Sequence, residues 1–205
     1  MKVEIVSDVI CPWCYIGKRR FEKALALVQD ELEVEVAWRP FQLNPDMPRQ
    51  GMPRAEYRKA KFGSAERGRQ LDARVAAEGQ GEGIAFAFDR MERTPNTLAA
   101  HQLIDLAQKQ GRAAAVVDAL FRAYFEEARD IGDEAVLRDI AARHGVADWP
   151  SAANEKEVAE AEESFRALGI SAVPTFVLGR RLGVSGAHPA EALASALREA
   201  ASSSG

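Results

Sequence analysis

The stretch Ile-Val-Ser-Asp-Val-Ile-Cys-Pro-Trp-Cys-Tyr, residues 5–15, holds the only two cysteines of the chain, Cys11 and Cys14. The residues before them alternate as in a β-strand, and Pro12 suits the first turn of a helix. Cys11 is therefore expected at the N-cap, between a strand and a helix. Two cysteines at this spacing can be a metal clip, a structural disulfide or a reactive pair.

The beginning of the chain has the pattern of a strand–helix–strand unit. Residues 2–7 form the first expected strand, and a helix with apolar residues at helical spacing follows from Pro12. Residues 33–39, Glu-Val-Glu-Val-Ala-Trp-Arg, alternate strictly between polar and apolar side chains. This alternation predicts a second strand and completes a βαβ unit.

The middle of the chain is expected to be helical. A run of prolines ends the alternation, and residues 54–79 then have a helical pattern rich in Arg, Glu and Ala. We interpret their basic side chains as a solvated face. Thr94 is expected to cap a second helix, residues 116–125 carry the apolar stripe of a third, and Asp133 is expected to cap a fourth. Asn154, with Glu157 three residues later, resembles a capping box for a fifth helix.

Strand patterns return near the end of the chain. Residues 172–178, Ala-Val-Pro-Thr-Phe-Val-Leu, predict a strand opened by a proline. A short turn leads to a partner strand at residues 182–185, and residues 189–201 form a last amphipathic helix. The expected second half is therefore a ββα unit.

The complete expected fold is α/β, with a large all-helical insertion between the two halves of one domain. The first half covers residues 1–44, the insertion residues 45–169 and the second half residues 170–201. Residues 202–205, Ser-Ser-Ser-Gly, are expected to form a disordered tail.

Two of the three interpretations of the cysteine pair are disfavoured. A zinc site needs about four ligands, and His101, His144 and His188 show no ligand spacing, so no metal is expected. The N-terminus has the pattern of a strand and no apolar signal segment, which predicts a cytoplasmic location. A structural disulfide is uncommon in that reducing compartment. Two cysteines that act only as small hydrophobic residues remain a less favoured alternative.

The reactive interpretation has direct physical support. A thiolate on Cys11 at the N-cap would be stabilised by the free N–H groups and the dipole of the helix. Pro12 fixes the first turn, and Trp13 is expected to shield the site beside an exposed Cys11. Cys14, one turn further on, is expected to be less exposed. Cys11 would then attack a substrate disulfide, and Cys14 would resolve the mixed disulfide.

Four further motifs support a family resemblance. They are Ser-Asp-Val-Ile-Cys-Pro-Trp-Cys-Tyr-Ile-Gly-Lys around the cysteines, Arg-Pro-Phe-Gln-Leu-Asn-Pro at 39–45, Asn-Thr-Leu-Ala-Ala-His at 96–101 and Val-Ser-Gly-Ala-His at 184–188. Together with the insertion and the Val173-Pro174-Thr175 strand, they resemble DsbA-like proteins of the thioredoxin superfamily. The nearest resemblance is to FrnE-type dithiol–disulfide oxidoreductases, and it covers nearly the whole chain.

The resemblance implies a thioredoxin fold with Pro174 in the cis form, facing the cysteines. A cis bond would present the backbone of Val173 to an extended substrate peptide. Some relatives carry a second cysteine pair near the C-terminus. This sequence has none, so no internal shuttle between two dithiols is expected.

The expected function is thiol–disulfide exchange, as oxidase, reductase or isomerase, on a protein or small-molecule disulfide. No bound cofactor is expected, because Cys11 and Cys14 carry the redox equivalents, and glutathione is a possible co-substrate. The main alternative is a glutathione-dependent enzyme of the kappa transferase or 2-hydroxychromene-2-carboxylate isomerase type, in which serine usually occupies the first cysteine position. A non-catalytic binding or chaperone module is a third hypothesis.

Several other residues are candidates for the site, each with a structural alternative. Asp8 can assist removal of a proton from Cys14, or it can be solvated or cap backbone groups. His101 and Asn96 can border a substrate cleft, although a histidine buried in a domain interface is the commoner case.

The segment before the last helix is a further candidate. The backbone N–H groups around Ser185, Gly186 and His188 can hold a carboxylate such as that of glutathione, or they can simply cap the loop. The net charge is −4 and no basic run is long, so no nucleic-acid partner is expected. The apolar stretches are too short to span a membrane, so no membrane partner is expected. A monomer and a homodimer both remain open.

Overall fold

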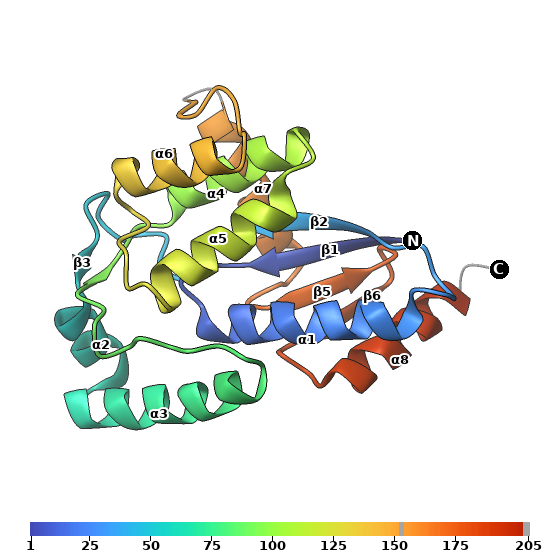
Figure 1. The fold of residues 1–205 in the computed structure, drawn as a ribbon, viewed down its shortest axis with the longest axis horizontal. Coiled ribbons are helices and arrows are strands. Elements are labelled where there is room, and N and C mark those ends of the chain that lie inside the picture. The colour runs from blue at the N-terminus through green and yellow to red at the C-terminus, as the bar shows by residue number, and fades with distance from the viewer. Residues whose placement is uncertain (152–153, 203–205) are drawn as a thin grey trace.

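A four-stranded sheet in the order β2-β1-β5-β6 forms the centre of the computed structural model, which describes residues 1–151 and 154–202 (Figure 1). Its strands are β1 (Lys2–Ser7), β2 (Glu35–Pro40), β5 (Thr175–Leu178) and β6 (Leu182–Ser185). β1 pairs in parallel with β2 and antiparallel with β5, and β6 pairs antiparallel with β5. The first and last parts of the chain therefore share one sheet, as expected.

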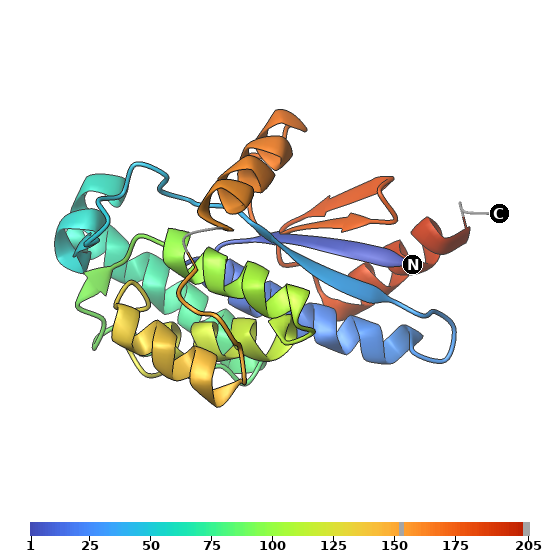
Figure 2. The same ribbon diagram turned by 90° about the horizontal axis from the view of Figure 1, so that it is seen from above.

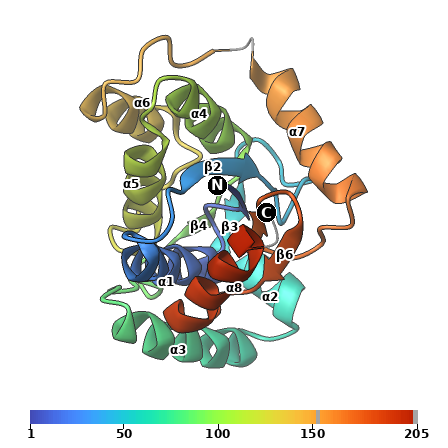
Figure 3. The same cartoon turned by 90° about the vertical axis from the view of Figure 1, so that its right-hand side faces the viewer.

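Helices cover both faces of this sheet. α1 (Pro12–Val28) and α8 (Ala190–Ser202) pack against each other on one face (Figure 3). Phe21 of α1 stacks on Phe176 of β5 with ring centroids 5.1 Å apart, and both are buried. On the other face, α4 and α7 contact β2. β1 is buried on both sides from Val3 to Ser7, although Glu4 and Ser7 are polar.

Among the residues that the structure describes, the chain between the two halves adds six helices. They are α2 (Arg54–Phe62), α3 (Ala65–Gly81), α4 (Leu98–Lys109), α5 (Ala113–Phe125), α6 (Glu134–Arg143) and α7 (Glu155–Ala167). The insertion also holds one short antiparallel ladder, in which β3 (Met52–Pro53) pairs with β4 (Arg93–Thr94). It is therefore not all-helical. α2 lies at the end of the molecule opposite to the start of β1 and the end of α8 (Figure 2).

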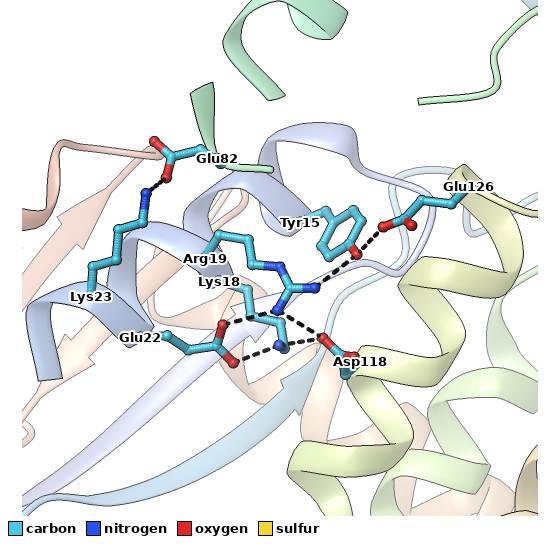
Figure 4. A network of polar contacts seen from close by, with 8 residues as sticks. All are labelled: Tyr15, Lys18, Arg19, Glu22, Lys23, Glu82, Asp118 and Glu126. Atoms are coloured by element: carbon cyan, nitrogen blue, oxygen red, sulfur yellow. Dashed lines mark hydrogen bonds and ion pairs between the residues drawn. The ribbon is translucent and has the colours of Figure 1, made fainter. Parts of the chain in front are cut away.

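A polar network fixes α1 to the insertion (Figure 4). The buried Lys18 donates to Glu22 at 2.6 Å and to Asp118 of α5 at 2.7 Å. Tyr15 donates its hydroxyl to Glu126 at 2.5 Å, and its ring stacks on Phe121 of α5 at 5.0 Å. The helix that carries the cysteines is thus held by both apolar and charged contacts.

One expected helix start is wrong, at Thr94, and the helix start at Asn154 is confirmed without its expected cap bond. Thr94 does not cap a helix, because it lies in β4 opposite Met52. α4 begins at Leu98, whose N–H donates to the side chain of Asn96 at 3.0 Å. Asn154 precedes α7 without a side-chain cap bond and instead donates to the carbonyl of Gln102 at 2.8 Å.

Other boundaries agree better with the prediction. Asp133 caps α6, since its carboxylate accepts the N–H of Ala135 at 2.8 Å. The helical stretch 54–79 is broken at Gly63, which has φ +84°, and Ser64 caps α3. Ser202 belongs to α8, and the rest of the expected tail, residues 203–205, lies outside the described residues.

Candidate active site

Cys11 lies at the junction between β1 and α1, as predicted. It is the N-cap residue of α1 with φ −91° and ψ 112°, and Pro12 occupies the first turn. The N–H of Cys14 donates to the carbonyl of Cys11 at 3.0 Å, which places the two cysteines on successive parts of one helical turn. The Cys11 sulfur forms no cap bond within the helix and instead lies 3.8 Å from the carbonyl oxygen of Val173.

Both cysteines are buried free thiols. The exposed fraction is 5% for Cys11 and 2% for Cys14, so the expectation of an exposed Cys11 is wrong. The reason is the insertion, whose helices α2 and α3 lie beyond the start of α1 and enclose a cavity against Cys11. Trp13 is the exposed residue of the motif, at 39%.

The two thiols have different electrostatic surroundings. Burial raises the pKa of Cys14 well above its ordinary value, and a hydrogen bond with Cys11 and the charge of Cys11 raise it further. The side chain of Ser7 and the backbone of Asp8 act in the opposite direction but do not overcome burial. Cys14 is therefore protonated at neutral pH, and it lies behind Cys11, which lines the cavity. This asymmetry suits an attacking Cys11 and a resolving Cys14.

Pro174 lies against α1 beside the cysteines. Its bond to Val173 is cis, as the resemblance implied. A methyl group added to Gly17 of α1 would come within 2.9 Å of the Pro174 ring. Only glycine therefore permits this close approach between the helix and the proline segment.

A cavity of about 370 Å³ opens beside Cys11. One wall consists of Ile10 to Trp13 together with Leu43. The opposite wall comes from α2 and α3, and Phe88, Tyr124 and Phe125 close the space. Arg54 and Arg58 line this cavity with side chains only 11% and 15% exposed, so they are not part of a solvated face.

The sequence carries a signal for this wall. Arg54, Arg58 and Lys61 recur at helical spacing together with Tyr57 and Phe62, which places cations and aromatic rings on one side of a helix. Basic residues mixed with aromatic residues on one side are less typical of a fully solvated face than basic residues alternating with acidic ones.

Comparison with known proteins agrees with this geometry. Residues 2–198 match the family described as the DSBA-like thioredoxin domain. The chain belongs to this family. A probable DsbA oxidoreductase from Streptomyces coelicolor is 37% identical, with a TM-score of 0.89 over 98% of this chain and 90% of that one.

More distant structures share the fold of the DSBA-like domain. The cytosolic disulfide reductase DsbM from Pseudomonas aeruginosa is 18% identical, with a TM-score of 0.71 over the full length of both chains. A 2-hydroxychromene-2-carboxylate isomerase is 19% identical, with a TM-score of 0.68 over the full length of both chains. At these identities the likeness concerns the fold alone.

Asp8 of the DSBA-like domain is fully buried, so a solvated role is wrong. One carboxylate oxygen accepts the N–H of Leu43 at 2.8 Å, and the other lies 3.3 Å from Nε2 of His101. The carboxylate thus joins the end of β1 to the segment after β2 and to α4. Asp8 interacts with the Cys14 thiol through its backbone.

His101 and Asn96 do not line the cavity beside Cys11. His101 is 3% exposed and lies in the interface between the two parts of the DSBA-like domain, which is the structural alternative. The Asn96 amide donates to the carbonyl of Met47 at 2.7 Å and accepts from Leu98. Both residues therefore position the insertion.

Ser185, Gly186 and His188 form a closed turn beside Pro174. The N–H of Gly186 donates to the carbonyl of Pro174 at 2.8 Å, and that of His188 donates to Gly186 at 3.0 Å. The His188 ring lies 2.9 Å from the carbonyl of Ser185. Because these N–H groups already have partners, the geometry favours loop capping over a carboxylate site.

Within 1–151 and 154–202, no three His, Cys, Asp or Glu side chains are grouped so that they can hold a metal ion. No helix in the same ranges is long and apolar enough to cross a membrane.

Proposed function

We propose that this DSBA-like protein is a thiol–disulfide oxidoreductase that acts through Cys11 and Cys14. The observation that carries the proposal is the asymmetric pair at the start of α1. Cys11 is the N-cap residue and faces a cavity, and Cys14 is a buried thiol with a raised pKa, one turn behind it. An enzyme that exchanges disulfides needs one accessible nucleophile and one protected resolving thiol.

The proposed reaction has two steps. The Cys11 thiolate attacks one sulfur of a substrate disulfide, forms a mixed disulfide and releases the other half as a thiolate. Cys14 then attacks the Cys11 sulfur, closes the Cys11–Cys14 disulfide and releases the second half. Cys14 must lose its proton in this step, and the Ser7 hydroxyl and the Asp8 backbone on its sulfur favour the thiolate. The reverse sequence oxidises a substrate dithiol.

We further propose that no bound cofactor takes part and that glutathione can serve as a co-substrate. The related reductase from Pseudomonas aeruginosa has been solved with glutathione. A cytoplasmic location is part of the proposal, in line with the description of that reductase as cytosolic. The FrnE-type assignment depends on the sequence motifs and stays a prediction.

The alternative is a glutathione-dependent transferase or isomerase, since the isomerase has the same fold. The chemical role of Cys14 distinguishes the two functions. In the dithiol mechanism Cys14 acts on the mixed disulfide at a very high effective concentration, up to about 10⁵–10⁸ M. In a transferase, glutathione supplies the thiolate and Cys14 has no chemical role.

The test compares Cys14→Ser with its matched control Cys11→Ser, both measured with insulin as a disulfide substrate and with glutathione plus an electrophile. We expect Cys14→Ser to accumulate a mixed disulfide on Cys11, seen by intact mass, and to lose turnover. Cys11→Ser should form no adduct. Full activity of Cys14→Ser in each assay where the wild type is active would refute the dithiol mechanism and favour the alternative.

A further inference from the structure

The cavity beside Cys11 has the size and lining of a small-molecule site. Its volume of about 370 Å³ falls in the range of such pockets, roughly 300–1,000 Å³. Aromatic rings from α2, α5 and the segment before β4 line it, including Tyr57, Phe62 and Phe88. Cys11 is 5% exposed and lines this space, so a disulfide must enter the cavity to reach it. The disulfide of a rigid protein surface fits this access poorly.

The charges in the cavity are unbalanced. Four cationic side chains line it, those of Arg54, Arg58, Lys61 and Arg74, and a single carboxylate, that of Asp72. The net charge of the lining is therefore about +3 at neutral pH, whereas that of the whole chain is −4. A cationic cavity in an acidic protein attracts anions selectively.

Asp72 neutralises only the inner part of this wall. It accepts from Arg58 at 2.7 Å and from Arg54 at 3.2 Å, so two guanidinium groups share one carboxylate. The two guanidinium groups also lie over the rings of Phe62 and Phe88, at 4.4 and 5.3 Å. Stacked guanidinium groups are held in position, which prepares their remaining N–H groups for a carboxylate.

Lys61 and Arg74 supply the remaining positive charge. Lys61 donates to the hydroxyl of Tyr57 at 2.6 Å. Among the described residues, neither Lys61 nor Arg74 has a carboxylate within ion-pair distance. Both side chains are exposed at the cavity, and a bound anion would be their first charged partner.

Building on the proposed function, we propose that the cavity selects low-molecular-weight disulfides with an aromatic or similarly flat apolar body and at least one carboxylate. The aromatic lining takes the body, the cationic wall takes the carboxylate, and the disulfide is presented to Cys11. α2 and α3 thus determine the substrate class, while α1 supplies the chemistry.

The electron balance of one turnover is complete without a further reactant. The reduced Cys11–Cys14 dithiol gives two electrons to the substrate disulfide, R–S–S–R. The products are two R–S⁻ thiolates and the Cys11–Cys14 disulfide, and the two thiol protons pass to solvent. Repeated turnover additionally needs a low-molecular-weight thiol, two molecules of which reduce the disulfide.

The test uses two aromatic disulfides that differ in charge. The anionic probe is 5,5′-dithiobis(2-nitrobenzoate), and the neutral probe is 4,4′-dithiodipyridine. The reduced full-length protein is mixed with each probe, and the second-order rate constant is measured from thiolate release. The charge variant is Lys61→Gln/Arg74→Gln. Its matched control, Lys59→Gln/Arg67→Gln, removes the same charges from exposed positions of the same helices outside the cavity.

We expect the charge variant to lower the rate constant for the anionic probe, relative to the neutral probe, by roughly 2- to 20-fold, since each exposed charge contributes a factor of a few. The control variant should change this ratio by less than about twofold. Raising NaCl from about 20 mM to about 0.5 M should lower the wild-type ratio by screening. An unchanged ratio in the charge variant, or an equal fall in both variants, would overturn the inference.

The same reaction tests the proposed function separately. A dithiol mechanism releases two thiolates from each anionic probe molecule and leaves an oxidised protein without an adduct. If two thiolates are released but no charge preference is found, the substrate inference fails and the function stands. If the wild type reacts with neither probe, or keeps an adduct on each cysteine, both fail.

Discussion

Replacing Asp8 tests whether this buried carboxylate is structural or takes protons from Cys14. Its oxygens contact the N–H of Leu43 at 2.8 Å and Nε2 of His101 at 3.3 Å, and its side chain is fully buried. Asp8→Ala removes both contacts and leaves a partly buried N–H and a buried imidazole without this partner. Each such group costs about 1–3 kcal/mol.

The two costs together span about 2–6 kcal/mol. Because Leu43 is only partly buried, we expect Asp8→Ala to lower the free energy of unfolding by an amount in the lower half of this range, about 2–4 kcal/mol. Asp8→Asn keeps an acceptor for Leu43 and should lose about 1–2 kcal/mol. The assay is urea unfolding of the reduced proteins, read as a shift of the midpoint at an unchanged slope. Asp133→Ala, which removes a surface cap, is the control and should lose about 1 kcal/mol.

A structural Asp8 also predicts that the folded Asp8→Asn protein resolves mixed disulfides at a rate close to that of the wild type. The reasoning is refuted if Asp8→Ala shifts unfolding by less than about 1 kcal/mol while Asp8→Asn slows resolution tenfold or more. That result would make the carboxylate a proton acceptor for Cys14.

Two further predictions concern α1. Gly17→Ala puts a methyl group 2.9 Å from the ring of Pro174, so we expect slower release of mixed disulfides. The free energy of unfolding should fall by about 0–2 kcal/mol, because the higher helix propensity of alanine partly offsets the cost of overpacking. Gly81→Ala is the control, because a methyl group there meets nothing within 4 Å. Both variants are measured by stopped-flow kinetics and by unfolding. Equal effects of the two substitutions would show that the contact between Gly17 and Pro174 is not the cause. The raised pKa of Cys14 predicts that the reduced protein loses stability as the pH rises above about 9, because the unfolded thiol ionises there and the folded one does not. Between pH 9 and about 10, below the titration of the buried tyrosines, the free energy of unfolding of reduced Cys14→Ser should fall less steeply than that of the reduced wild type. The two slopes should differ by up to about 1.4 kcal/mol per pH unit. Parallel curves of unfolding free energy against pH would show that burial of Cys14 does not affect stability.

The parts of the fold that depend on local sequence were predictable. Cys11 ends an alternating strand and precedes a proline, so the N-cap position follows from residues within one turn of it. The ββα half follows from alternation near Pro174. Asp133 was recognisable as a cap because its carboxylate acts within its own helix.

The wrong predictions share a dependence on distant partners. Thr94 has a good local cap signal, but it pairs with Met52, which is not visible from the residues near it. The burial of Cys11 and the role of Arg58 both come from the way α2 and α3 close over the start of α1. Asp8 could not be assigned from sequence, because its partners Leu43 and His101 come from two other segments.

The pairing of β1 with β5 has a consequence for the order of assembly during synthesis. Cys11 and Val173, which meet in the site, are separated by 162 residues. At about 5–20 residues per second, a ribosome needs roughly 8–30 s between them. During this interval β1 has β2 on one side and an open edge on the other, and an open apolar edge is a template for pairing with foreign chains. The redox centre can therefore be completed only after Val173 has been made, 162 residues after its first cysteine.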